Sequence, residues 1–238
     1  MKIKIDEAVL RDYPGARIGW LIADISAVPE ESRYVDMMKY RLEDKLKDIG
    51  MTEDTLLLHP DVMRWRNVFS KMGVKPGKYK SSLEALLRRV FKGELWSVST
   101  VVDCYDSVSA MNLLPMGAFD MEHIAGDLTL RYGKEGEKFL PLGAEGEPVE
   151  VHEKHIVYAD SEKVCCWLWN HRDSREAGLS DTTKKALFMI DCAFETEWRS
   201  VEEGLAALKT ELEKIEAKVL SSGICDGKAT ECNTEGEL

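Results

Sequence analysis

The first half of the chain has the hydrophobic spacing of amphipathic helices. In residues 29–50, apolar residues recur every three or four positions before Gly50, which predicts a helix with a glycine stop. Ser81 and Glu84 have the spacing of a capping box at the start of another helix. Three further elements are predicted from the same patterns: a strand over 16–26, a helix over about 61–72, and a helix over 97–114, which fits helical spacing slightly better than alternation.

The second half is dominated by short β-rich runs. Five of them are separated by Gly, Pro and acidic turns at intervals typical of antiparallel sheet: DLTLRY, KFLPLG, HIVYAD, VCCWLWN and ALFMIDCAF. Helical order returns over about 200–220, where Ser200 and Glu203 form a second capping box. Helices followed by strands, without βαβ alternation, predict one α+β domain over residues 1–220. The polar, acidic remainder, 221–238, is expected to be disordered.

The segment LPMGAFD, residues 114–120, lies between these two halves. Pro115 and Gly117 argue against a regular helix or a central strand at this point. Two interpretations remain: a turn between packed elements, or the rim of a pocket that binds a substrate.

Charge is distributed unevenly along the 238 residues. The net charge of −11 argues against non-specific nucleic-acid binding, which depends on neutralising phosphates. From Met63 to Gly93, however, nine basic residues accompany a single acid, Glu84. This segment forms either solvated helix surfaces, the simpler interpretation, or a local anion-binding surface. No apolar run suits a signal peptide or a membrane span, so a cytoplasmic protein without membrane contact is expected.

Several familiar kinds of site are not supported by the sequence. The six cysteines lack the paired spacing of a zinc site, and no glycine-rich phosphate loop or nucleophile elbow is present, so no metal or cofactor is expected. His152 and His155 are interpreted as surface turn histidines, because their spacing is not that of a helical metal site. Cys225 and Cys232 could pair, although reduced thiols are expected in a cytosol.

Two stretches are stronger candidates for chemistry. In WLWNHRDS, an apolar strand is followed by a polar cluster that includes Asn170, Arg172 and Asp173, which either closes a turn or lines a polar cavity. In ALFMIDCAF, Asp191 interrupts an apolar run. Because a buried lone carboxylate is costly, Asp191 must be hydrogen-bonded, paired, or in contact with a wet pocket.

These residues resemble a known family. The run VVDCYDSVSAMNLLPMGAFDMEHIAGDLTLRYGKEGEKFLPLG, with HIVYAD and ALFMIDCAF, resembles the editing domain of the phenylalanyl-tRNA synthetase beta subunit, the B3/B4 tRNA-binding domain. Two stretches are more similar to stand-alone proteins built on that domain: WRNVFSKMGVKPGKYKSSLEALLRRVFKGELWSVSTVVDCYDSVS and WNHRDS. The resemblance spans about residues 60–195. It implies N-terminal helices packed on a mixed or antiparallel sheet, with a C-terminal amphipathic helix, and no complete aminoacyl-tRNA synthetase.

The resemblance also implies a site. In the synthetase, this domain hydrolyses tRNA that was wrongly charged with tyrosine, using a positioned water and a terminal ribose hydroxyl. Asp191 falls where the family has a Glu that recognises the tyrosine hydroxyl, and Gly117 replaces a pocket-lining His. A tyrosine-specific pocket is therefore not expected here. A cavity for a different ligand is expected instead.

Three functions follow as hypotheses. The first is an editing-like protein that binds a tRNA acceptor end transiently and hydrolyses a mischarged ester in trans. The second is a non-catalytic module for tRNA or a small amino acid, and the third is a partner-binding protein that uses the helix around Leu208. For the first, the pocket residues are Gly117, Asn170, Arg172, Asp173 and Asp191, and the phosphate contacts are Lys75, Lys78, Lys80, Arg88, Arg89 and Lys92.

Overall fold

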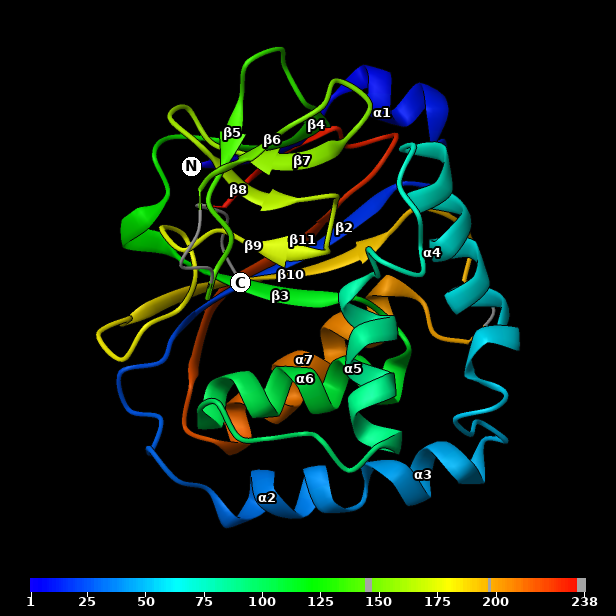
Figure 1. Ribbon diagram of the computed structural model, residues 1–238. Helices are drawn as coiled ribbons and strands as arrows, with labels where there is room; N and C mark the ends of the chain where they lie inside the picture. Colours follow the sequence, from blue (N-terminus) through cyan, green and yellow to red (C-terminus); the bar gives the residue numbers. More distant parts are fainter. Residues whose placement is uncertain (144–146, 197, 235–238) are drawn as a thin grey trace.

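Two β-sheets and a layer of helices are stacked in the computed structural model, which describes residues 1–143, 147–196 and 198–234 (Figure 1). One sheet has the strand order β12-β1-β4-β7-β8-β9, and the other has the order β11-β2-β10-β3. A short β5-β6 pair stands beside them. Below the second sheet lie α5, α6 and α7, with α2 and α3 outside them (Figure 1). The predicted α+β class is confirmed.

All the described α-helices except α3 begin at a residue whose side chain caps the first turn. The α-helices are α1 (Glu7–Asp12), α2 (Arg33–Tyr40), α3 (Leu42–Asp48), α4 (Pro60–Lys71), α5 (Ser82–Phe91), α6 (Thr100–Asn112) and α7 (Val201–Lys214), with 3-10 turns at Leu56–Leu58 and Met121–His123. Ser200 and Glu203 form the complete predicted capping box of α7. The Ser81 side chain caps α5, but the second half of the predicted capping box is not formed. The Glu84 side chain accepts hydrogen bonds from Arg66 and Arg88 instead. The single helix predicted over 29–50 is two helices, separated at Arg41.

The strands are mostly antiparallel. They are β1 (Lys2–Ile5), β2 (Arg17–Asp24), β3 (Met116–Asp120), β4 (Leu128–Tyr132), β5 (Lys138–Phe139), β6 (Val149–Glu150), β7 (Ile156–Ala159), β8 (Val164–Trp167), β9 (Arg172–Asp173), β10 (Lys185–Cys192), β11 (Lys218–Cys225) and β12 (Glu231–Asn233). The one parallel pair is β1 with β4, among the described residues. The first strand, β1, was not predicted from the sequence.

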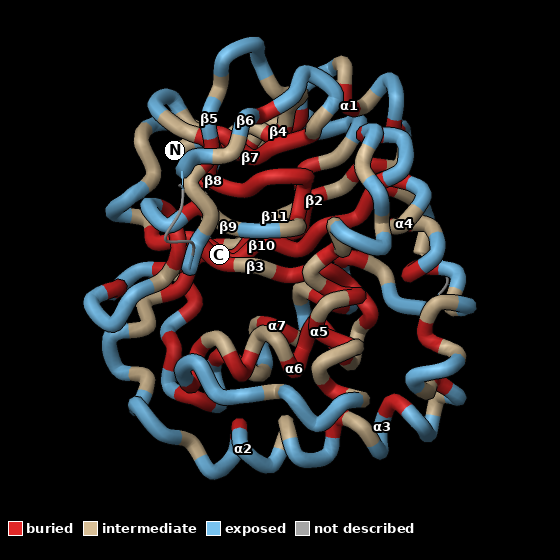
Figure 2. Tube along the Cα trace, viewed as in Figure 1, coloured by how far each residue is buried: buried red, intermediate tan, exposed pale blue. Residues whose placement is uncertain are grey.

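The central strands β2 and β10 have core on both faces, as Figure 2 shows by the burial along them. Their side chains alternate: Trp20 and Met189 pack between the two sheets, whereas Leu21 and Phe188 pack against the helices. The same period of two places Asp191 on the face of β10 that looks toward the other sheet. A carboxylate therefore stands at the edge of an apolar core.

The segment LPMGAFD is a strand and not the turn considered above. Its residues Met116–Asp120 form β3, an edge strand that pairs with β10 alone in the four-stranded sheet. An edge position explains why Pro115 and Gly117 are tolerated, because one side of the strand needs no partner. The carbonyl of Pro115 still accepts a hydrogen bond from the backbone N–H of Asp191 (2.9 Å).

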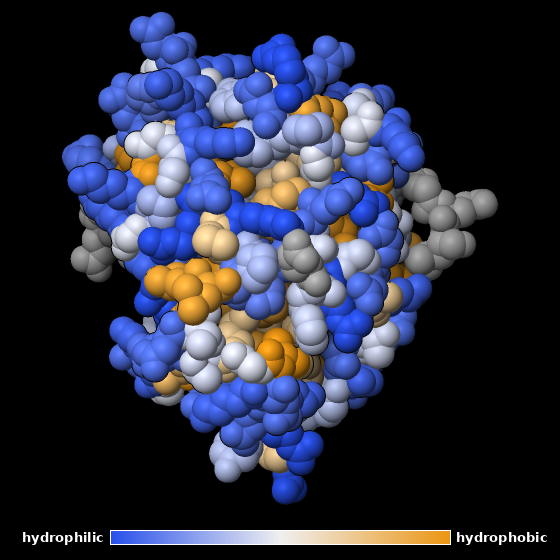
Figure 3. All heavy atoms as spheres, turned by 90° about the vertical axis from the view of Figure 1, so that its right-hand side faces the viewer, coloured by the Kyte–Doolittle hydropathy of each residue, from blue (hydrophilic) through white to orange (hydrophobic). Residues whose placement is uncertain are grey.

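The helix α4 flanks the stacked sheets (Figure 1). Its Trp65 and Phe69 are buried, and the Trp65 ring meets the Trp169 ring edge to face, with centroids 5.4 Å apart. The surface on this side is mostly hydrophilic, with hydrophobic residues in separate groups (Figure 3). The apolar side of α4 is therefore used inside the molecule, where it supports the chain around Trp169.

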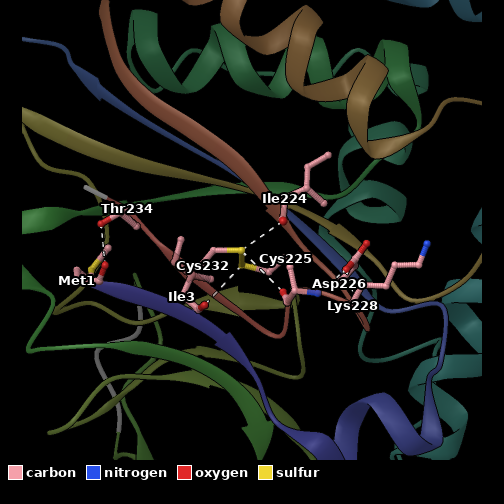
Figure 4. The surroundings of a disulfide bond; sticks show 9 residues. Met1, Ile3, Ile224, Cys225, Asp226, Lys228, Cys232 and Thr234 are labelled. Carbon is pink, nitrogen blue, oxygen red and sulfur yellow. Dashed lines mark hydrogen bonds between the residues drawn. A yellow bond between two sulfur atoms is a disulfide. The ribbon is translucent and has the colours of Figure 1, made fainter. Parts of the chain in front are cut away.

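The prediction of a disordered tail over 221–238 is wrong for much of that segment, which forms strands. Residues 218–225 form β11, which covers the free edge of β2, and β12 pairs with β1. This pairing satisfies backbone groups that a bare sheet edge would expose, and the predicted helix over 200–220 accordingly ends at Lys214. Cys225 and Cys232 form a disulfide, in place of the expected reduced thiols (Figure 4). Residues 235–238 of the predicted tail lie outside the described residues.

Candidate functional site

A strained turn follows β8 and brings a polar cluster to the sheet edge. Leu168 and Trp169 both have left-handed backbone angles, with φ of 54° and 64°. Such angles are unfavourable for bulky residues and persist only where the surroundings enforce them. The backbone N–H of Trp169 donates to the backbone carbonyl of Ile156. The backbone carbonyl of Asn170 accepts from the backbone N–H of Ser82 at the start of α5 (3.0 Å). These bonds tie the turn to β7 and α5.

The turn forms one wall of a cavity of about 150 Å³, which we call the polar cavity. Side chains from β3, β7, β8, β9, β10, the 168–171 turn and the start of α5 line it. All five pocket residues predicted from the sequence meet here: Gly117, Asn170, Arg172, Asp173 and Asp191. Residues that are 74 positions apart in the chain, Gly117 and Asp191, are thus brought to one site by the pairing of β3 with β10.

Asp191 is the more deeply buried of the two carboxyls in the cavity, with 4% of its surface exposed. The hydroxyl of Tyr158, from the neighbouring sheet, donates a hydrogen bond to Asp191 Oδ1. Burial raises the pKa of Asp191 to about 7, although the Tyr158 hydrogen bond and the nearby Asn170 and Trp169 N–H groups oppose that rise. Near neutral pH, Asp191 therefore exchanges between a hydrogen-bond acceptor and a neutral acid.

Asp173 is the second carboxyl of the polar cavity. Burial raises its pKa to about 6, against the opposing effects of the Cys166 thiol and the Arg172 charge. A Cβ atom added at Gly117 would stand 3.6 Å from Asp173 Oδ2, so the glycine leaves this carboxyl uncovered. Arg172 is exposed and donates to the carbonyl of Leu142 (3.2 Å), at the mouth of the cavity.

Several buried polar atoms of the cavity lining lack hydrogen-bond partners among the described residues. They are both amide atoms of Asn170, Nε1 of Trp169 and Oγ of Ser82. The Asn170 and Trp169 N–H groups lie near enough to Asp191 to affect its pKa but outside hydrogen-bond geometry. Buried polar groups are otherwise almost always satisfied, so their convergence on one cavity indicates a site for a polar ligand.

A larger groove opens beside the cavity, and we call it the basic groove. It has a volume of about 580 Å³ and shares Ser82, Met116, His171 and Arg172 with the polar cavity. Four predicted phosphate contacts line it, and two predicted contacts, Lys75 and Lys78, do not. The charged residues of its lining are the bases Lys80, Arg88, Arg89, Lys92 and Arg172 and the acids Glu94 and Asp106.

Glu84 fixes one of these bases in place. Its buried carboxylate accepts hydrogen bonds from Arg66 (2.8 Å) and from Nε of Arg88 (3.0 Å). The single acid of the basic segment is thus an internal anchor between α4 and α5. It offsets one of the two arginine charges and leaves the other four bases of the groove unbound by Glu84.

Sequence reasoning missed several residues of the site. Tyr158 and Cys166 alternate with apolar neighbours in ordinary strands, so their sequence context gives no signal that they face a cavity. Ser82 gives no separate signal, because its neighbour Ser81 is the cap of α5. Trp169 carried one available signal, since it directly precedes the polar cluster that was singled out.

In the part of the chain that the structure describes, no group of three or more His, Cys, Asp or Glu side chains is arranged to hold a metal ion. None of the described helices has both the length and the apolar character needed to cross a membrane. His155 is half-buried and accepts a hydrogen bond from Trp167 Nε1 (3.1 Å), so it is a packed residue and not the surface histidine expected.

Comparison with known proteins identifies a family. The profile of the B3/4 domain family matches residues 64–214, more than half of the chain. The protein belongs to the B3/4 domain family. The expected resemblance to the phenylalanyl-tRNA synthetase beta subunit is thereby confirmed, and the matched range includes both the polar cavity and the basic groove.

Similar curated proteins include beta subunits of phenylalanine–tRNA ligase. That of Aquifex aeolicus is 28% identical over 171 residues, which are 69% of this chain and 20% of the relative. That of Chromobacterium violaceum is 37% identical over 76 residues, 32% of this chain and 9% of the relative. The chain thus spans a fifth or less of these relatives. Among solved structures, an N-terminal fragment of the Pyrococcus horikoshii phenylalanyl-tRNA synthetase beta subunit matches with 13% identity and a TM-score of 0.46, over 91% of this chain and 49% of that one.

Proposed function

We propose that the polar cavity binds the aminoacyl group at the 3′ end of a tRNA, while the basic groove binds the acceptor strand that leads to it. One observation carries this proposal: a small cavity with two carboxyls and unsatisfied polar atoms opens directly beside a groove lined by five bases. Membership of the B3/4 family and the names of the relatives, which are tRNA ligase subunits, support the assignment to tRNA.

The cavity limits the size and chemistry of the bound group. A volume of about 150 Å³ suits a group about the size of benzene. Asp191 and Tyr158 stand deep in the cavity, where a donor or acceptor on an amino-acid side chain would reach them. Asp173, with its pKa raised only to about 6, is mostly ionised at pH 7 and suits an ammonium group or a water.

The proposed reaction is hydrolysis of the aminoacyl ester in trans. Water adds to the ester carbonyl carbon, the bond from that carbon to the ribose oxygen breaks, and the ribose oxygen takes up a proton. Cys166 is unsuited as a nucleophile, because burial and the neighbouring Asp173 raise the pKa of its thiol well above the usual range. Catalysis would therefore rest on positioning of the water, with Asp173 as the candidate proton acceptor.

Deacylation of a panel of correctly and wrongly charged tRNAs tests the proposal. Purified protein should accelerate release of at least one amino acid, and Asp173→Asn should lower that rate about a hundredfold. Asp54→Asn is the matched control, because Asp54 is exposed and lies outside the site. No release above background from any tRNA would refute the hydrolase, and binding of uncleaved aminoacyl-tRNA would then identify a non-catalytic binding module.

Binding to the RNA is tested separately from cleavage. Raising the salt concentration from 50 to 200 mM should weaken tRNA binding strongly, because each phosphate contact releases counterions. The combined variant Arg89→Gln and Lys92→Gln should bind more weakly and show a shallower salt dependence. If the unaltered protein causes no gel shift of tRNA at low salt, the tRNA part of the proposal is wrong.

A further inference from the structure

An exposed tryptophan stands on the wall of the basic groove. Trp96 lies in the segment between α5 and α6, and 62% of its surface is exposed. Its backbone N–H donates to the carbonyl of Glu94 (3.1 Å), which bends the segment tightly beside the groove. An indole with this much exposure is not needed for the core, so its position invites a functional explanation.

The indole is held from one side. The Arg89 guanidinium lies 5.1 Å from the centre of the Trp96 ring, in cation–π contact. Arg89 shares the groove lining with Asp106, where burial raises the pKa of the Asp106 carboxyl to about 6 and the Arg89 charge opposes that rise. The cation–π contact thus holds the indole from one side and leaves most of the side chain exposed.

We propose that Trp96, backed by Arg89, stacks on a nucleobase of a single-stranded RNA end that lies in the basic groove. This inference rests on the proposed function and adds the groove residue that holds a base. Proteins bind single strands by combining cations along the backbone with aromatic side chains on which bases stack. The basic groove supplies both, with five bases against two acids and one exposed aromatic ring.

The relative sizes of the two spaces fit this division. The groove, at about 580 Å³, is nearly four times as large as the polar cavity, at about 150 Å³. A nucleotide therefore fits the groove, and the smaller acyl group fits the cavity. Ser82 and Met116 line both spaces, so a single ligand can extend from one into the other.

The test is binding of a short 5′-labelled RNA ending in CCA to the full chain, measured by fluorescence anisotropy at low salt. Trp96→Ala should weaken binding about tenfold, and Trp96→Phe should retain most of it, because phenylalanine keeps a stacking face. Trp198→Ala is the matched control: Trp198 is also exposed and also contacts an arginine, Arg199, but lies outside the groove. It should bind as the unaltered protein does.

An RNA whose 3′-terminal nucleotide lacks its base separates stacking from other effects. The unaltered protein should bind it about tenfold more weakly than the complete RNA, and Trp96→Ala should lose little further affinity. Equal binding of the complete RNA by Trp96→Ala and the unaltered protein would overturn the stacking inference alone. Failure of the unaltered protein to bind any RNA would overturn the inference together with the proposed function.

Discussion

Replacement of Asp191 by Asn tests the electrostatics of the polar cavity through protein stability. The folded-state pKa of Asp191 is raised from 3.8 to about 7. Between these two pH values, the folded protein holds a proton that the unfolded chain has lost. The stability linked to this proton is fully present below about pH 4 and is lost as the pH rises through about 7. The full effect is at most about 4 kcal/mol.

Asp191→Asn removes the titration with little change of shape. The asparagine oxygen can still accept the hydrogen bond from the Tyr158 hydroxyl. We therefore expect the stability of the variant, relative to the unaltered protein, to rise from about pH 4 to about pH 7 and to level off by pH 8. Free energies of unfolding from urea denaturation at four or five pH values across this range provide the measurement.

A control variant isolates the burial of this one carboxyl. Asp54→Asn removes the same charge from an exposed position, and its stability relative to the unaltered protein should stay nearly constant over the same range. If the difference between Asp191→Asn and the unaltered protein is also constant, Asp191 is not held as a neutral acid. The explanation of the cavity by desolvation would then be wrong.

Two further predictions concern the packing around the site. Gly204→Ala should destabilise the protein by about 1 kcal/mol or more although alanine favours helices, because its Cβ would come 2.5 Å from Leu114 Cδ1; a raised urea midpoint would contradict this. Glu84→Gln should cost about 1.5–3 kcal/mol, since it weakens charged hydrogen bonds to Arg66 and Arg88. The same denaturation measures it, and a change below about 0.5 kcal/mol would show that the anchor contributes little.

Local signals explain why most helices could be predicted. A cap residue and a repeat of three and four positions lie within one segment, so Ser81 and Ser200 were visible without knowledge of the fold. The missed strands depend on distant partners. Ile3 of β1 pairs with Leu128 of β4, and β11 is a strand because it covers the edge of β2. Nothing in either segment reports that pairing.

The same distinction applies to the candidate site. Asn170, Asp173 and Asp191 could be predicted because each lies in or beside an apolar run. Burying a polar group there without a hydrogen-bond partner costs free energy, so the sequence alone marks these positions. Tyr158 could not be predicted, because its role is set by the approach of β7 to β10 from the other sheet. Trp96 could not either, because only the fold places it on the wall of the basic groove.

Gly117 connects the sequence comparison with the chemistry of the cavity. The expected loss of a pocket-lining side chain leaves Asp173 uncovered, since the nearest atom to an added Cβ at Gly117 is Asp173 Oδ2. Burial is the main cause of the raised pKa of Asp191, and the neighbouring Asp173 carboxyl adds to it. A ligand that brings hydrogen-bond donors or a positive charge relieves this repulsion, whereas a purely apolar ligand leaves it in place. We therefore expect the polar cavity to select its ligand by donors and charge more than by shape.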